Sequence, residues 1–112
     1  MDLPQTVKLV EVGPRDGLQS ISAIMPTEDK CRWIDALAAA GLREIEVGSF
    51  VSPKRLPQMA DTAQVVAHAR TRPGLRVMAL VPNLQGAEAA LQAGVHKITV
   101  PVTGICTLTR DR

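Results

Sequence analysis

The chain has 112 residues, which is enough for one small domain. Hydrophobic residues make up 46% and charged residues 21%, so the composition excludes a disordered tail or a low-complexity linker. The formal net charge is only +2, the basic residues are scattered along the chain, and the aromatic fraction is 2%. These values disfavour a nucleic-acid-binding protein, which usually carries a basic stripe and aromatic side chains that stack on bases.

The sequence also lacks the features of a membrane or secreted protein. No run of eighteen apolar residues is present, and the N-terminal residues MDLPQ lack the basic and apolar regions of a signal peptide. The two cysteines, Cys31 and Cys106, fit no zinc or redox spacing. We therefore expect a reduced, cytoplasmic setting and no membrane contact.

Strand and helix patterns alternate along the chain. A β-branched run over residues 7–12 predicts a first strand, and residues 15–26 predict a long loop because they show no periodicity. Thr27 is the expected N-cap of a helix that ends at Gly41, and Asp61 is the expected cap of the next helix. The other expected elements are strands over 42–47, 75–81 and 95–102, a loop over 48–59, a second helix that ends before Pro73, and a third helix over 84–93.

This alternation predicts an α/β fold in which parallel strands are joined by right-handed crossovers. There is also weak internal similarity between residues 40–47 and 93–100, since a helix-ending glycine is followed in both by an apolar and a basic residue. One recurring turn geometry accounts for this similarity without a duplication. It favours repeated α/β units over a ferredoxin-like fold.

Polar residues follow the expected strands at their carboxyl ends, where parallel α/β folds bind ligands. Glu46 is the most informative, because it lies in an apolar strand and an unpaired buried carboxylate is costly. Arg15 is its natural partner. Glu11 poses the same question one strand earlier, and there a buried ion pair with Arg or Lys and a functional role both stay open. The full set of candidates is Arg15, Asp16, Gln19, Glu46, Ser49, Lys54, Asn83 and Thr103.

Several residues keep two interpretations at this point. Asp16 either hydrogen-bonds its own backbone in a turn or binds a hard divalent cation, and spacing does not decide between these roles. His68 and His96 are expected at the surface rather than as metal ligands. Cys31 is expected to be a small core residue, and Cys106 is assigned no role.

Three sequence blocks resemble a known family. Residues 10–19 (VEVGPRDGLQ) are similar to the opening motif of 3-hydroxy-3-methylglutaryl-CoA lyases, which belong to the metal-dependent lyase and Claisen-synthase superfamily of TIM barrels. Residues 49–61 (SFVSPK through PQMAD) and 82–86 (PNLQG) resemble two later blocks of the same lyases. Pro14 and Leu18-Gln19 favour the lyases over the synthases. The resemblance extends over about residues 7–100.

The resemblance implies a partial (β/α)8 barrel, with the first four parallel strands and three intervening helices of a fold that needs about 250 residues. Residues 1–104 would form the N-terminal half of the barrel domain. Residues 105–112 continue no block, which predicts a truncation or a change of reading frame near Gly104.

The implied reaction is retro-Claisen cleavage of 3-hydroxy-3-methylglutaryl-CoA to acetyl-CoA and acetoacetate, as in leucine degradation and ketone-body formation. Asp16 would bind Mg²⁺ or Mn²⁺, Arg15 would stabilise the enolate, and Glu46 would orient Arg15 and the ligand shell of the metal. Gln19 and Ser49 would line the acyl-CoA site. Lys54 is a weaker candidate for meeting anionic parts of the substrate.

The sequence departs from the family in several places. Val47 and Gly48 stand where the family usually has small hydroxyl residues, and residues 99–104 differ from its usual Ala-Ser-Glu ending. The family completes its metal site with an H-x-H pair and an Asn from later strands, and brings a Cys from a late Gly-rich loop. This sequence stops before them, and Cys106 comes too early to be that Cys.

Two alternatives stay open. The first is a related Claisen synthase or aldolase of the same superfamily. The second is a non-catalytic half-barrel, whose two unpaired parallel edges favour association with another copy. For the isolated chain we expect weak or absent catalysis, because a single carboxylate ligand gives poor affinity for Mg²⁺.

Overall fold

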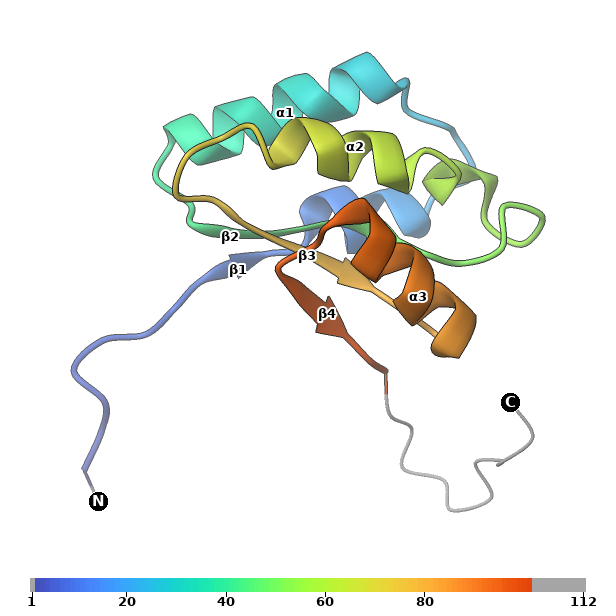
Figure 1. Cartoon of the computed structure of the whole chain (residues 1–112). Coiled ribbons are helices and arrows are strands. Elements are labelled where there is room, and N and C mark those ends of the chain that lie inside the picture. The colour runs from blue at the N-terminus through green and yellow to red at the C-terminus, as the bar shows by residue number, and fades with distance from the viewer. Residues whose placement is uncertain (1, 102–112) are drawn as a thin grey trace.

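The computed structural model describes residues 2–101. Its sheet has four parallel strands in the order β1 (Val10–Glu11), β2 (Glu44–Ser49), β3 (Arg76–Leu80) and β4 (Lys97–Thr99). Three helices, α1 (Thr27–Ala39), α2 (Thr62–Ala69) and α3 (Leu84–Ala93), cover one face of this sheet (Figure 1). The predicted α/β architecture with four parallel strands and three helices is confirmed.

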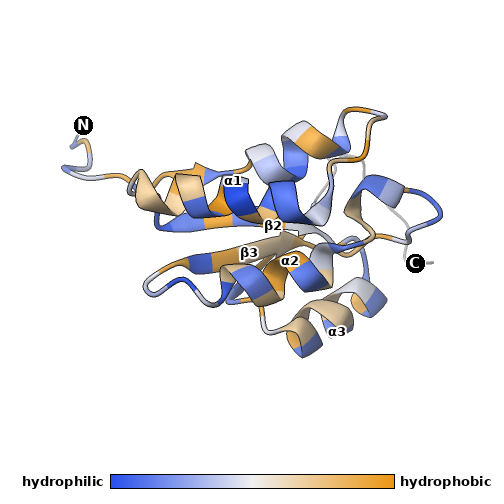
Figure 2. Cartoon of the chain, turned by 90° about the horizontal axis from the view of Figure 1, so that it is seen from above, coloured by the Kyte–Doolittle hydropathy of each residue, from blue (hydrophilic) through white to orange (hydrophobic). Residues whose placement is uncertain are grey.

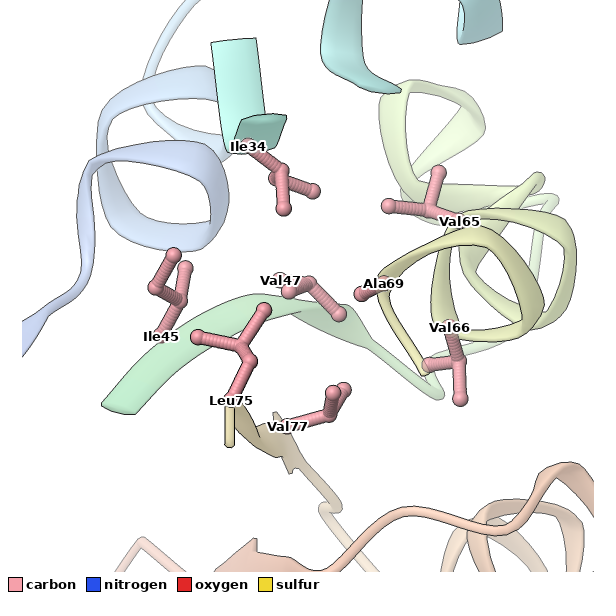
Figure 3. Close-up of a cluster of buried hydrophobic side chains, with 8 residues drawn as sticks. All are labelled: Ile34, Ile45, Val47, Val65, Val66, Ala69, Leu75 and Val77. Carbon is pink, nitrogen blue, oxygen red and sulfur yellow. The ribbon is translucent and has the colours of Figure 1, made fainter. Parts of the chain in front are cut away.

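The hydrophobic core lies between the sheet and the helices. Strand alternation turns Ile45 and Val47 of β2 toward the helices, where they meet side chains from α1, α2 and β3 (Figure 3). The helices lie side by side across the sheet and present mixed, often hydrophilic surfaces on their outer side (Figure 2). The buried members of the core are Ile34, Ile45, Val47, Val65, Val66, Ala69, Leu75 and Val77. The core is therefore aliphatic, as the low aromatic fraction predicts.

The helix ends agree with the sequence in part. Gly41 and Gly94 follow α1 and α3 with φ of +106° and +88°, a conformation that favours glycine. The prediction for Thr27 is wrong, because Pro26 occupies the N-cap and Thr27 is the first helical residue. Asp61 does occupy the N-cap of α2, but its side chain makes no capping hydrogen bond. It instead accepts a hydrogen bond from the Thr27 hydroxyl at 2.6 Å.

Three other expectations are corrected by the structure. The expected loop over 15–26 overlaps η1 (Gly13–Gly17), a π-helical turn that continues as helix to Gln19. This element is too short to give a periodic pattern, although Pro14 is well placed in its first turn. β1 and β4 are shorter than expected, since each is an edge strand with one hydrogen-bonded neighbour. Thr103, Cys106 and the expected tail lie outside the described residues, so the boundary at residue 104 stays a prediction.

Gly48 lies against the first residue of α2. A Cβ atom at this position would come within 2.6 Å of the Thr62 hydroxyl oxygen. That hydroxyl donates to the backbone oxygens of Ser49 at 2.9 Å and Met59 at 2.7 Å, so it is held in place. The departure from the family at Gly48 thus leaves room for a hydroxyl that comes from α2.

We expect Gly48→Ala to lower the free energy of unfolding by about 1–3 kcal/mol, because the new methyl group overpacks a fixed contact. Urea unfolding followed by circular dichroism measures the change. Gly17→Ala is the matched control, since a Cβ there meets no heavy atom within 4 Å. Equal stability of Gly48→Ala and Gly17→Ala would contradict the packing described.

Candidate functional site

A buried carboxylate and an arginine meet at the carboxyl edge of the sheet. The Nε of Arg15, in η1, donates to Oε1 of Glu46 in β2 at 2.5 Å. The hydroxyl of Thr99 in β4 donates to Oε2 of the same carboxylate at 2.7 Å. The side chain of Glu46 is 3% exposed and that of Arg15 is 17% exposed. The predicted pairing of Arg15 with Glu46 is confirmed, and both carboxylate oxygens serve to hold neighbouring groups.

The orientation of Arg15 follows from this pairing. Its Nε is used by Glu46, and its Nη1 lies 3.5 Å from Oδ1 of Asp16. A guanidinium has five N–H donors in a rigid plane, so most of them stay available to a ligand. The arrangement can therefore present a fixed positive charge to an anionic oxygen.

Thr99 is a member of this group that was not among the candidates. The internal similarity between residues 40–47 and 93–100 carried the signal, because it aligns Glu46 with Thr99 and Glu44 with Lys97. Both aligned pairs are in contact, the second through an ion pair of 3.5 Å. These equivalent positions lie on β2 and β4, on either side of β3, and face the same side of the sheet, away from the helices.

Two further candidates also come together. The Ser49 hydroxyl, at the end of β2, donates to Oε1 of Gln19 at 2.8 Å. Ser49 is fully buried, whereas Gln19 is half-buried at the end of the helical turns that begin with η1. The structure thus joins the segment after β1 to the end of β2 through side chains expected to line a substrate site.

Asp16 is the most accessible acidic group of the site, with a side chain 63% exposed. The turn interpretation is not supported, because among residues 2–101 its carboxylate bonds only to Arg15. Carboxylate oxygens suit a hard divalent cation. Within the same residues no group of three or more His, Cys, Asp and Glu side chains gathers to hold a metal ion. Among residues 2–101, Asp16 is therefore an exposed carboxylate that could supply a single ligand to such a cation.

Other candidates lie apart from this group or have structural roles. Lys54 is exposed on the β2–α2 connection, and Asn83 caps α3 by accepting from the Gly86 backbone N–H at 2.8 Å. The ion-pair interpretation of Glu11 is not supported among residues 2–101, since its carboxylate accepts from the Gly13 backbone N–H at 2.9 Å. Glu44 forms ion pairs instead, with Lys8 at 3.9 Å and with Lys97.

The two histidines serve packing between elements. His68 is half-exposed, and its Nε2 lies 2.9 Å from Oδ1 of Asp35, which joins α2 to α1. Nδ1 of His96 accepts from the Val77 backbone N–H at 2.9 Å. The expectation of surface positions is confirmed for His96, which is exposed, and in part for His68.

A hollow of about 640 Å³ opens beside Ser49, between the N-terminal part of α2 and the length of α3. Its walls are mostly apolar and include Phe50, Met59, Ala63 and Ala89. It adjoins the Gln19–Ser49 contact through Ser49. No helix among residues 2–101 has both the length and the apolar character needed to cross a membrane.

Cys31 is only partly buried in α1, which corrects the expectation of a core residue. Burial, followed by the charges of Asp35 and Asp61, raises the pKa of its thiol above the ordinary value, and Lys30 opposes this. The folded protein therefore favours the neutral thiol, and this contribution to stability is lost as the pH rises through the raised pKa.

We expect iodoacetamide to alkylate Cys31 more slowly in the folded chain than in urea at about pH 8, because the thiolate is the reactive form. A Cys106→Ser background leaves Cys31 as the only thiol. Mass spectrometry of the labelled chain against time and pH measures the rate. A folded chain that reacts as fast as the unfolded one would contradict the raised pKa.

Comparison with known proteins shows which family this chain resembles. A family model described as HMGL-like matches residues 6–109. A Pseudomonas aeruginosa protein named 3-hydroxy-3-isohexenylglutaryl-CoA/hydroxy-methylglutaryl-CoA lyase is 58% identical over 100 residues, which are 89% of this chain and 33% of that protein.

Solved structures agree with these matches. The crystal structure of hydroxymethylglutaryl-CoA lyase from Pseudomonas aeruginosa superimposes with a TM-score of 0.81 at 58% identity, over 89% of this chain and 33% of its own. An HMG-CoA lyase from Acinetobacter baumannii, solved with coenzyme A and 3-methylmalate, gives a TM-score of 0.78 at 36% identity over 83% of this chain and 30% of its own. The chain spans about a third of the length of these relatives.

Proposed function

We propose, from the premise that this chain belongs to the HMGL-like family, that residues 2–101 supply the arginine-bearing part of the active site of a metal-dependent carbon–carbon lyase. The observation that carries this proposal is the buried Glu46 carboxylate, which holds Arg15 at the carboxyl edge of a parallel sheet. This is the edge at which barrels of parallel strands place their catalytic groups.

The proposed reaction is the retro-Claisen cleavage of a 3-hydroxy-3-methylglutaryl thioester. The tertiary hydroxyl loses its proton and the carbon–carbon bond breaks, which gives acetoacetate and the enolate of acetyl-CoA. Arg15 faces the negative charge that develops on the enolate oxygen, and Glu46 and Thr99 keep its guanidinium from reorganising. A divalent cation, for which Asp16 would supply one carboxylate ligand, lowers the pKa of the hydroxyl when bound.

An acyl-CoA thioester is the proposed substrate class. Gln19 and Ser49 would line the acyl group, and the apolar hollow beside Ser49 offers room for a neighbouring part of the molecule. The Pseudomonas aeruginosa relative is named for two glutaryl thioesters that differ in their branch, so both belong in an assay. We propose leucine degradation in the cytoplasm as the setting, on the reaction class and on the sparse cysteines.

A second candidate function is that of a non-catalytic half-barrel, which acts only by pairing with another chain. Apolar side chains are exposed beside both edge strands, namely Val7, Leu9, Ile98 and Val100. β1 and β4 each have one unpaired edge, and such edges favour association. This candidate predicts a dimer of the 112-residue chain without lyase activity.

The test uses a hybrid barrel, in which residues 2–101 replace the matching third of the Pseudomonas aeruginosa relative. The purified hybrid barrel receives Mg²⁺ and either thioester, and acetoacetate or its branched counterpart is measured. We expect product at a rate within about tenfold of the unmodified relative. A folded hybrid barrel without product would refute the proposal, and condensation of acetyl-CoA with an oxo acid would favour a synthase. Gel filtration of the 112-residue chain tests the half-barrel candidate, which predicts the mass of a dimer.

A further inference from the structure

A buried positive charge lies beside the site and has no part in the proposed chemistry. The Lys30 side chain, in α1, is 3% exposed. Its ammonium donates to Oδ1 of Asp61 at 2.6 Å and to the backbone oxygen of Gln58 at 2.6 Å. Because an ammonium is costly to bury without partners, these two contacts fix the connection between β2 and α2 against the start of α1.

Gln58, which this contact holds, reaches the opposite segment with its side chain. Its Nε2 donates to the backbone oxygen of Ile21 at 2.6 Å and of Gln19 at 3.4 Å. One amide thus binds the chain on both sides of Ser20. Both N–H groups of a glutamine amide are donors, so a single side chain can serve both carbonyl groups.

The segment that Gln58 binds has few other anchors. Leu18 is buried, but the next apolar side chains, Ile21 and Ile24, are 46% and 59% exposed. Packing therefore contributes little beyond Gln19. Polar contacts hold the backbone instead, namely local bonds from Ser20 to the Asp16 oxygen and from the Ile21 N–H to the Leu18 oxygen, and the distant contacts from Gln58. The Gln19 side chain extends from this turn, and its Oε1 accepts a hydrogen bond from the Ser49 hydroxyl at 2.8 Å.

We propose that Gln58 is a positioning residue for substrate binding, which acts through the backbone of Gln19 and Ile21 and is itself held by the Lys30–Asp61 ion pair. The proposal rests on the function proposed above, in which Gln19 and Ser49 line the acyl group. Loss of the Gln58 donors releases Gln19 from Ser49. Gln19 and Ser49 then no longer line the acyl group together, so substrate binding weakens. The hydrogen bond between Arg15 and Glu46 is unaffected.

The test replaces Gln58 in the hybrid barrel by Glu or by Met. Gln58→Glu turns a donor into a carboxylate that faces two carbonyl oxygens, and Gln58→Met removes the donor. We expect each to raise KM about tenfold with a much smaller change in kcat, since one hydrogen bond to a backbone oxygen contributes about that factor. Gln64→Glu, the same change at an exposed position of α2, should leave both constants unaltered.

The pH dependence separates positioning from a general loss of structure. As the pH falls from about 8 to about 5, toward the ordinary glutamate pKa of about 4.3, a growing fraction of the Gln58→Glu carboxyl is protonated and its O–H can donate again. We expect its KM, relative to the unsubstituted hybrid barrel at each pH, to recover in part. Gln58→Met has no group to titrate and should stay weak throughout.

Two results would overturn the proposal. One is an unchanged KM in Gln58→Met, and the other is a loss in both variants that follows a lower Tm and does not recover with pH. An inactive unsubstituted hybrid barrel refutes the proposed function instead. Amide hydrogen exchange of residues 20 and 21 in the 112-residue chain then tests the positioning, with about tenfold faster exchange expected in Gln58→Met and equal exchange contradicting it.

Discussion

Arg15→Gln in the hybrid barrel lowers kcat for acetoacetate formation by about 10²- to 10³-fold. The substitution removes the positive charge that we propose faces the developing enolate oxygen, and the loss of one such stabilising group costs about this factor in comparable sites. It also breaks the contact with Glu46 that sets the orientation of the side chain. Steady-state kinetics with saturating thioester and Mg²⁺ measure the effect.

Arg15→Lys is the matched control for charge. A lysine keeps the charge but has no planar fork with which to bond Glu46 and a ligand together, so we expect an intermediate loss. Thr99→Val removes only one hydrogen bond to Glu46 and should cost less than either. An Arg15→Gln hybrid barrel that folds normally and keeps kcat within about threefold of the unsubstituted one would remove Arg15 from the chemistry.

Asp61→Asn in the 112-residue chain lowers the free energy of unfolding by about 3 kcal/mol, a large fraction of the total stability of a small domain. The asparagine keeps the shape of the side chain and an oxygen that accepts from Thr27. It removes the negative charge that compensates the buried ammonium of Lys30. Urea unfolding with circular dichroism measures the loss.

The double variant Lys30→Met/Asp61→Asn tests the cause of that loss. Methionine fills a similar volume without a charge, so the double variant should recover most of the stability. Equal loss in the single and double variants would show that the destabilisation does not come from an uncompensated charge. Asp35→Asn, at a half-exposed ion pair with His68, should cost much less than Asp61→Asn.

The sequence predicts the elements best where long periodic segments alternate with glycine. The third helix has the expected bounds, 84–93, and the buried face of α2 is confirmed through Val65, Val66 and Ala69. η1 was not predicted, because two helical turns do not repeat often enough to show a period. The lengths of the edge strands β1 and β4 were overestimated, since an apolar β-branched run indicates strand propensity but not whether a partner strand is present.

The site is predictable where burial forces a partner on a charged group. Glu46 lies between two apolar residues of a strand, which alone indicates a pairing, and Arg15 follows the preceding strand as its natural partner. The same reasoning did not predict the partner of Glu11, because the nearby Gly13 backbone N–H, rather than a basic side chain, donates to its carboxylate. No sequence pattern predicts the proposed role of Gln58. That role depends on two backbone oxygens that only folding brings close to its side chain.

The most direct measurement is the rate of acetoacetate formation by the hybrid barrel before and after chelation of divalent cations. With Arg15, Asp16 and Glu46 supplied by this chain, we expect the rate to fall to background in EDTA and to return when Mg²⁺ or Mn²⁺ is added in excess. Asp16→Ala should raise the concentration of metal needed for half the full rate. A full rate in EDTA, or cleavage that persists in Arg15→Gln, would contradict the assignment of this chain to metal-dependent carbon–carbon cleavage.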